Sequence, residues 1–102
     1  MTEMQENAEK AADFLRFLAN PNRLMILCML MEGERCAGEL EEQLNISQSA
    51  LSQHLALMRE GDIIESRKEA QKVFYSIKDG GASEILGVLY ELYCKGESTP
   101  CQ

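Results

Sequence analysis

The segment from Gln48 to Glu60, QSALSQHLALMRE, divides into a polar and an apolar face when it is placed on an α-helix. With about 100° of rotation per residue, its polar side chains fall within one arc and most of its apolar ones within the other. The polar arc consists of Gln48, Ser49, Ser52, Gln53, Ala56, Arg59 and Glu60. The opposite arc consists of Ala50, Leu51, Leu55, Leu57 and Met58 around His54. The pattern predicts a helix with Ser47 as its N-cap and His54 among its packed residues, presenting short amides and hydroxyls outward.

Apolar spacing predicts four more helices and one hairpin. Asn20 is a suitable cap for the second helix, because Pro21 follows at the first helical position. Asp79 is the expected cap of the last helix. The predicted helices cover residues 4–19, 21–32, 37–44 and 80–95, and the predicted strands cover residues 63–68 and 72–77 around a charged turn at 69–71.

The length of 102 residues predicts a single domain over 1–102, in which residues 96–102 form a flexible tail. The longest apolar run, LMILCMLM, is much shorter than a membrane span. The first residues, MTEMQENAEKAADF, resemble neither a secretory signal nor a transit peptide. We therefore expect a cytoplasmic protein without a membrane partner.

The formal net charge is −7, but it is distributed unevenly. Residues 1–46 carry 4 basic and 9 acidic side chains, residues 47–78 carry 5 and 4, and residues 79–102 carry 1 and 4. An acidic total argues against indiscriminate binding to polyanions, whereas a local basic patch can still contact phosphate. The middle of the chain is the part that can do so.

The four cysteines are expected to be reduced thiols, because no secretion signal accompanies them. The sequence has no Cys-x-x-Cys pair and only one His, which argues against a thioredoxin-like enzyme and against a zinc ribbon. We expect neither an enzyme nor a resident cofactor or metal.

The polar face of the segment after Ser47 suits a DNA groove. Gln pairs with adenine edges, and Ser bonds to phosphates or to several bases. The preceding short helix and the turn Asn45–Ile46–Ser47 complete a helix-turn-helix, and the hairpin brings Arg67, Lys68 and Lys72 to a wing that can reach neighbouring phosphates. The alternative is a solvated helix face on a winged-helix module that binds another protein.

The fold class is therefore mainly α with a small β-hairpin wing, in the order of four helices, two strands and a fifth helix. Both terminal helices carry more apolar surface than one core needs, because Phe14, Leu15 and Leu18 in the first and Val88, Leu92 and Tyr93 in the last lie on more than one face. We expect a homodimer that buries this surface.

The stretches RLMILCML, SQSALSQHLALMREGDII and RKEAQKVFYSIK resemble the ArsR family of bacterial repressors, in particular its HlyU, SqrR and BigR subgroup. The resemblance implies a dimer joined through the terminal helices, with the helix after Ser47 in the major groove and the wing beside it. The implied DNA contacts are Ser47, Gln48, Ser49, Ser52, Gln53, Arg67, Lys68 and Lys72.

The same resemblance implies a role for two of the cysteines. In that subgroup, thiols at the positions of Cys28 and Cys94 form a polysulfide bridge when persulfides accumulate, and the DNA is released. Cys36 and Cys101 are expected to be bystanders. A direct disulfide needs Cα atoms about 4.4–6.8 Å apart, so a wider separation of the two thiols would favour inserted sulfur over simple oxidation.

A metal-responsive repressor that binds arsenite through cysteine thiolates remains an alternative. The family's Cys-x-Cys pair is incomplete here, because Gly38 follows Cys36 at the second position, and the last predicted helix has no His. A metal would therefore need three of the four cysteines to converge.

Overall fold

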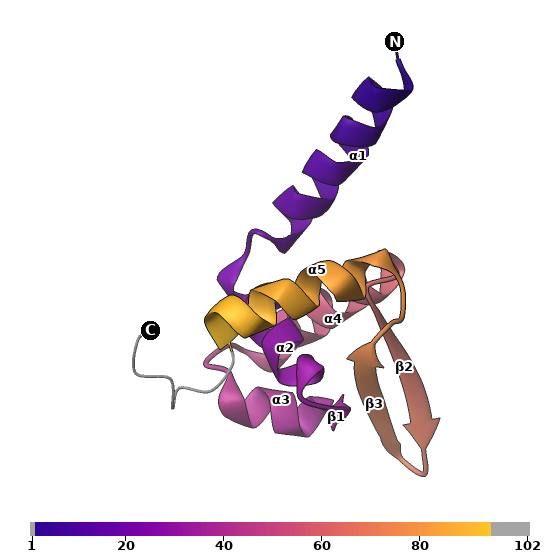
Figure 1. The fold of residues 1–102 in the computed structure, drawn as a ribbon. Helices are drawn as coiled ribbons and strands as arrows, with labels where there is room; N and C mark the ends of the chain where they lie inside the picture. Colours follow the sequence, from indigo (N-terminus) through magenta and orange to yellow (C-terminus); the bar gives the residue numbers. More distant parts are fainter. Residues whose placement is uncertain (1, 95–102) are drawn as a thin grey trace.

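We describe residues 2–94 in a computed structural model, without the side chains of residues 81, 82 and 94. The predicted tail, residues 96–102, lies outside the described residues. Helices and strands follow in the order expected, with one additional short strand (Figure 1). They are α1 (Glu3–Leu18), α2 (Pro21–Met31), β1 (Arg35–Cys36), α3 (Ala37–Gln43), α4 (Gln48–Glu60), β2 (Ile64–Glu69), β3 (Lys72–Ile77), α5 (Gly81–Leu89) and the π-helical turn η1 (Tyr90–Cys94).

The helix starts follow from capping side chains. Asn20 Oδ1 accepts a hydrogen bond from the Arg23 amide at 3.1 Å, and Ser47 Oγ accepts one from the Ala50 amide at 3.1 Å, as predicted. The predicted cap at Asp79 is wrong, because α5 begins after Gly80. Gly80 has a φ of 153°, which a residue with a Cβ rarely adopts, so the helix starts one residue later than expected.

The wing is a hairpin in which β2 and β3 pair from Ile64–Ile77 to Glu69–Lys72. Its turn consists of Ala70 and Gln71, and Ala70 has a φ of 58°. The third strand, β1, pairs with the other edge of β3 and was not predicted. A strand of two residues is too short to show an alternating pattern, so only the tertiary fold reveals it.

Helix α2 lies at the centre of the core, with Ile26 and Leu27 almost fully buried. The inner face of α4 packs into the same core through Leu51, Leu55 and Met58. Leu57 departs from the expected pattern and is exposed. Because α4 is buried on one side only, its amide and hydroxyl face points to solvent.

Helix α1 projects from the rest of the protein, and α5 crosses over α2 (Figure 1). Within α1 only Leu18 is buried, whereas Met4 is 80% exposed. The exposed large apolar residues of these helices and of α2 and η1 are Met4, Leu15, Met25, Ile85, Val88, Leu92 and Tyr93. The prediction of surplus apolar surface on both terminal helices is thus confirmed. None of the helices described between residues 2 and 94 has the length and apolar content to cross a membrane.

Candidate nucleic-acid interface and thiol site

The outward face of α4 carries the side chains predicted to read DNA. Gln48, Ser49, Ser52 and Gln53 are all exposed and lie in the first two turns of the helix. Ser47 precedes them, and its hydroxyl both caps the helix and lies 3.3 Å from the Ser49 hydroxyl. Four of the five predicted α4-region contacts thus share one solvent-facing surface, and the fifth fixes where that surface begins.

The helix that precedes α4 holds it from behind. Leu40 of α3 and Leu44, at its C-cap, are buried in the same core as Leu51. Ile46, in the turn, packs against this core while being only partly buried. The two helices and their turn therefore form a rigid unit, which is the arrangement of a helix-turn-helix.

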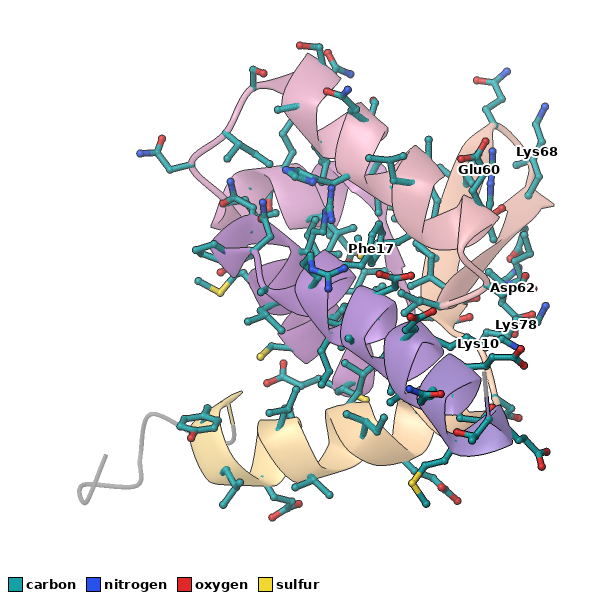
Figure 2. All side chains as sticks on the ribbon, turned by 90° about the horizontal axis from the view of Figure 1, so that it is seen from above. Lys10, Phe17, Glu60, Asp62, Lys68 and Lys78 are labelled. Atoms are coloured by element: carbon teal, nitrogen blue, oxygen red, sulfur yellow. The ribbon has the colours of Figure 1, made fainter. Side chains whose placement is uncertain are left out.

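Arg23 joins α1, α2 and α4 at a polar junction. Its Nε donates to His54 Nδ1 at 3.3 Å, its Nη1 donates to the Phe17 carbonyl oxygen at 2.8 Å, and its guanidinium carbon lies 4.1 Å from the centre of the Phe17 ring. Figure 2 shows Phe17 where α1 meets the body of the protein. The prediction that His54 packs inward is confirmed in part, since His54 is half-buried.

The charge state of His54 follows from this junction. Partial burial, and then the neighbouring charge of Arg23, lower the pKa of His54 below its usual value. The imidazole is therefore neutral near pH 7, with Nδ1 as the acceptor for Arg23. Sequence reasoning missed Arg23, although a single basic residue in the first turn of an otherwise apolar helix was a signal.

The wing presents two lysines and one arginine in different settings. Lys68 and Lys72 are exposed, and within residues 2–94 neither forms an ion pair; Figure 2 shows Lys68 pointing away from the ribbon. Arg67, by contrast, donates to Glu34 from Nε at 2.7 Å and from Nη2 at 2.8 Å, and to Glu69 from Nη1 at 2.6 Å. The Arg67 hydrogen bonds hold the pKa of Glu34 below its usual value. Arg67 remains a predicted DNA contact, but it already has two anionic partners.

Cys28 lies half-buried on α2, beside the end of the chain's last helix. It lines an apolar cavity of about 20 Å³ together with Leu86, Leu89 and Tyr90, and an open depression together with Tyr93. The expectation that all cysteines are reduced is wrong here, because Cys28 is disulfide-bonded. The predicted thiols of Cys94 and Cys101 lie outside the side chains that the structure describes.

Cys36 is the free thiol among the described cysteines and lies elsewhere, at the start of α3. Its amide donates to Glu39 Oε1 at 3.0 Å, and this bond lowers the pKa of Glu39. Across residues 2–94, no group of three or more His, Cys, Asp or Glu side chains is arranged to hold a metal ion. The metal-responsive alternative thus finds no ligand set in the described part of the chain.

Residues 20–66 match the family described as bacterial regulatory protein, arsR family. Over 95 residues the chain is 45% identical to the transcriptional activator HlyU of Vibrio cholerae, an alignment that covers 93% of this chain and 88% of HlyU. The chain belongs to the ArsR family. It is also 39% identical to the biofilm growth-associated repressor of Xylella fastidiosa over 95 residues, which are 93% of this chain and 83% of that one.

Solved structures agree with this assignment. Reduced HlyU from Vibrio cholerae superposes with a TM-score of 0.84 at 45% identity, covering 93% of this chain and all of that one (100%). The repressor BigR from Xylella fastidiosa gives a TM-score of 0.84 at 39% identity, covering 90% of this chain and 91% of that one. The predicted winged helix-turn-helix is therefore confirmed, and this ArsR-family protein is a DNA-binding transcriptional regulator and not an enzyme.

The lowered pKa of His54 predicts a pH dependence of stability. Because the folded pKa lies below the unfolded one, stability is present in full above about pH 6.5 and is lost as the pH falls through the folded pKa. His54→Asn keeps an acceptor near the position of Nδ1 but cannot take up a proton. Urea denaturation between about pH 8 and pH 5 should show a larger loss of unfolding free energy for the unaltered protein than for His54→Asn. Parallel curves for the two proteins would contradict the assignment.

Proposed function

We propose that this protein is a cytoplasmic homodimeric repressor that reads an operator with α4 and the wing, and that leaves DNA when reactive sulfur joins Cys28 to Cys94. The observation that carries the sensing part is the position of Cys28. It faces Tyr90 and Tyr93 of η1, the segment that contains the backbone of Cys94. A bridge from α2 to this segment would act on the end of the helix that carries exposed apolar surface.

The exposed face of α4 supports base reading. Gln48 and Gln53 offer both a donor and an acceptor, which is what the edge of an adenine requires. Ser49 and Ser52 are short enough to bond to phosphates or bases without blocking close approach. These neutral groups let an acidic protein approach DNA without placing carboxylates in the groove.

The wing supports phosphate binding next to the helix. Lys68 and Lys72 lie near the tip of the hairpin, on the two strands that follow α4 in the chain. Each cation that neutralises a phosphate releases counterions, so binding should weaken steeply as salt increases. Arg67 was predicted to share this role, but its guanidinium already donates hydrogen bonds to Glu34 and Glu69.

The exposed apolar residues of α1 and α5 support a homodimer. Val88 is 60% exposed and Leu92 is 62% exposed, on the helix that crosses the body of the protein. Leaving such surface in water costs about 25 cal/mol per Å² of apolar area. A second copy offers the same surface, so a two-fold dimer would cover both at once.

The sulfur chemistry balances without a metal or an added oxidant. Each thiolate attacks the terminal sulfur of an organic persulfide R–S–SH, so that a protein persulfide forms and the thiolate R–S⁻ leaves. Condensation of the persulfides at Cys28 and Cys94 then gives a Cys–S–S–S–Cys bridge and releases H₂S. The apolar cavity of about 20 Å³ beside Cys28 has room for a water-sized atom.

The disulfide at Cys28 affects how the site could distinguish persulfides from simple oxidants. From the sequence, a separation of the two thiols wider than about 4.4–6.8 Å between Cα atoms would have disfavoured direct oxidation. Cys28, however, forms a direct S–S bond. We therefore do not propose that the distance between the two thiols makes the site selective for persulfides. One solved relative is reduced HlyU from Vibrio cholerae, which supports a redox-dependent role for thiols in this chain as well.

Gln53→Ala should weaken binding to a duplex selected from a randomised pool by about 1–3 kcal/mol, which is about 5- to 150-fold in Kd. Binding to unrelated duplex and the salt dependence should stay unchanged, because no phosphate contact is lost. Gln43→Ala removes the same amide from an exposed position at the end of α3 and serves as the control in mobility-shift assays. Failure of the unaltered protein to select any duplex would argue for the protein-interaction module instead.

Treatment of the reduced protein with an organic persulfide should release DNA and yield linked Cys28 and Cys94 peptides that carry an additional sulfur atom. Cys28→Ser and Cys94→Ser should bind DNA normally but no longer respond, whereas Cys36→Ser should respond like the unaltered protein. Mass spectrometry and mobility shifts provide the two readouts. A product confined to Cys36 or Cys101 would refute the assignment.

Val88→Glu should weaken the dimer by about 2 kcal/mol or more, because a charge would enter the proposed interface. Gln43→Glu adds the same charge to an exposed position of α3 and should leave the dimer intact. Sedimentation equilibrium measures both. A mass distribution unaffected by Val88→Glu would place the interface elsewhere.

A further inference from the structure

Arg67 spans the sheet instead of pointing away from it. In the register of the wing, Arg67 of β2 pairs with Phe74 of β3, which in turn pairs with Cys36 of β1. The Arg67 guanidinium carbon lies 4.8 Å from the centre of the Phe74 ring, and its fork reaches Glu34, just before β1. One side chain thus connects both edges of the sheet across its central strand.

The three hydrogen bonds of Arg67 require the planar geometry of its guanidinium. Nε and Nη2 donate to the two oxygens of Glu34, which is the bidentate geometry of a strong arginine–carboxylate pair. Nη1 donates to Glu69 at 2.6 Å, near the turn of the hairpin. Lysine could not make these three directed contacts, because its ammonium has no planar fork.

The charge of this cluster opposes a contact with DNA. Two carboxylates surround one guanidinium, so Glu34, Arg67 and Glu69 together carry a formal charge of about −1 at neutral pH. A phosphate that approached Arg67 would meet both carboxylates and would have to displace them. Lys68, the next residue along β2, carries no such partner within the described chain.

We propose that Arg67 is a positioning residue, which fixes the wing against the turn between α2 and β1, and that the phosphate contacts of the wing belong to Lys68 and Lys72. This proposal refines the proposed function. Its statement about phosphate contacts rests on that function, because it assumes that the wing binds DNA. Glu34 supplies the carboxylate that holds Arg67 in this role, although it lies 33 residues away in the sequence.

The salt dependence of DNA binding separates positioning from phosphate contact. Lys68→Ala and Lys72→Ala should each make the negative slope of log K against log salt shallower by about 0.9, because each removes one phosphate contact. Arg67→Gln should weaken binding about five- to tenfold, because a wing that is no longer held against Glu34 presents Lys68 and Lys72 in the right place for only a fraction of the time. Glu34→Gln should have the same effect, and the double variant should be no weaker than Arg67→Gln.

Glu65→Gln is the matched control for Glu34→Gln, because it also removes one exposed carboxylate, here from β2 of the wing, and Glu65 forms no hydrogen bond with Arg67. A loss of slope in Arg67→Gln that Glu34→Gln does not share would overturn the proposal, because it would mean that Arg67 itself contacts phosphate. Tighter binding by Glu34→Gln than by Glu65→Gln would also overturn it, since it would mean that Glu34 withholds Arg67 from DNA.

Amide hydrogen exchange of the DNA-free protein tests positioning independently of DNA binding. Arg67→Gln and Glu34→Gln should both accelerate exchange in β1 and β3, whereas Lys68→Ala should not. Unchanged exchange in the first two variants would overturn the proposal even if DNA binding follows expectation. If the unaltered protein binds no DNA, the proposed function fails, but the exchange experiment still decides the role of Arg67.

Discussion

Helix α4 packs against the core through one face only, and this packing determines which of its side chains the domain presents to solvent. Leu51, Leu55 and Met58 are at most 3% exposed and pack into the core centred on α2. Because a helix buried along one face must present the opposite face to solvent, the same packing that stabilises the domain also aims Ser52 and Gln53 outward. The stability of the domain and its proposed recognition of DNA therefore both depend on one helix, and a substitution on its inner face would disturb both.

The sequence predicted what local periodicity and capping determine, and it failed where contacts between distant residues decide. The faces of α4, the cap at Asn20 and the hairpin from β2 to β3 follow from spacing within a few residues. Strand β1, the Arg23–His54 hydrogen bond and the Arg67–Glu34 pair join residues that no short window contains. The disulfide at Cys28 belongs to the same class, because a thiol's partner depends on tertiary proximity.

The turn between α2 and β1 connects features that seemed separate in the sequence. Glu32 accepts a hydrogen bond from the Tyr90 hydroxyl at 3.3 Å and pairs with Arg35 at 3.1 Å, while Glu34 holds Arg67 of the wing. Tyr90 lines the same cavity as Cys28. The proposed sulfur site and the wing are thus attached to one short turn. Acidic side chains of this turn hold these elements in place, while the proposed contacts with DNA fall to neutral and basic groups.

Hydroxyl-radical footprinting on a selected operator tests whether two copies of the protein read DNA with α4. If two copies of the protein each insert α4 into the major groove, the protected sugars should form two clusters on one face of the duplex, about 10 base pairs apart or a multiple of this spacing. A single protected cluster, or protection without helical periodicity, would contradict a dimer that reads two half-sites with α4.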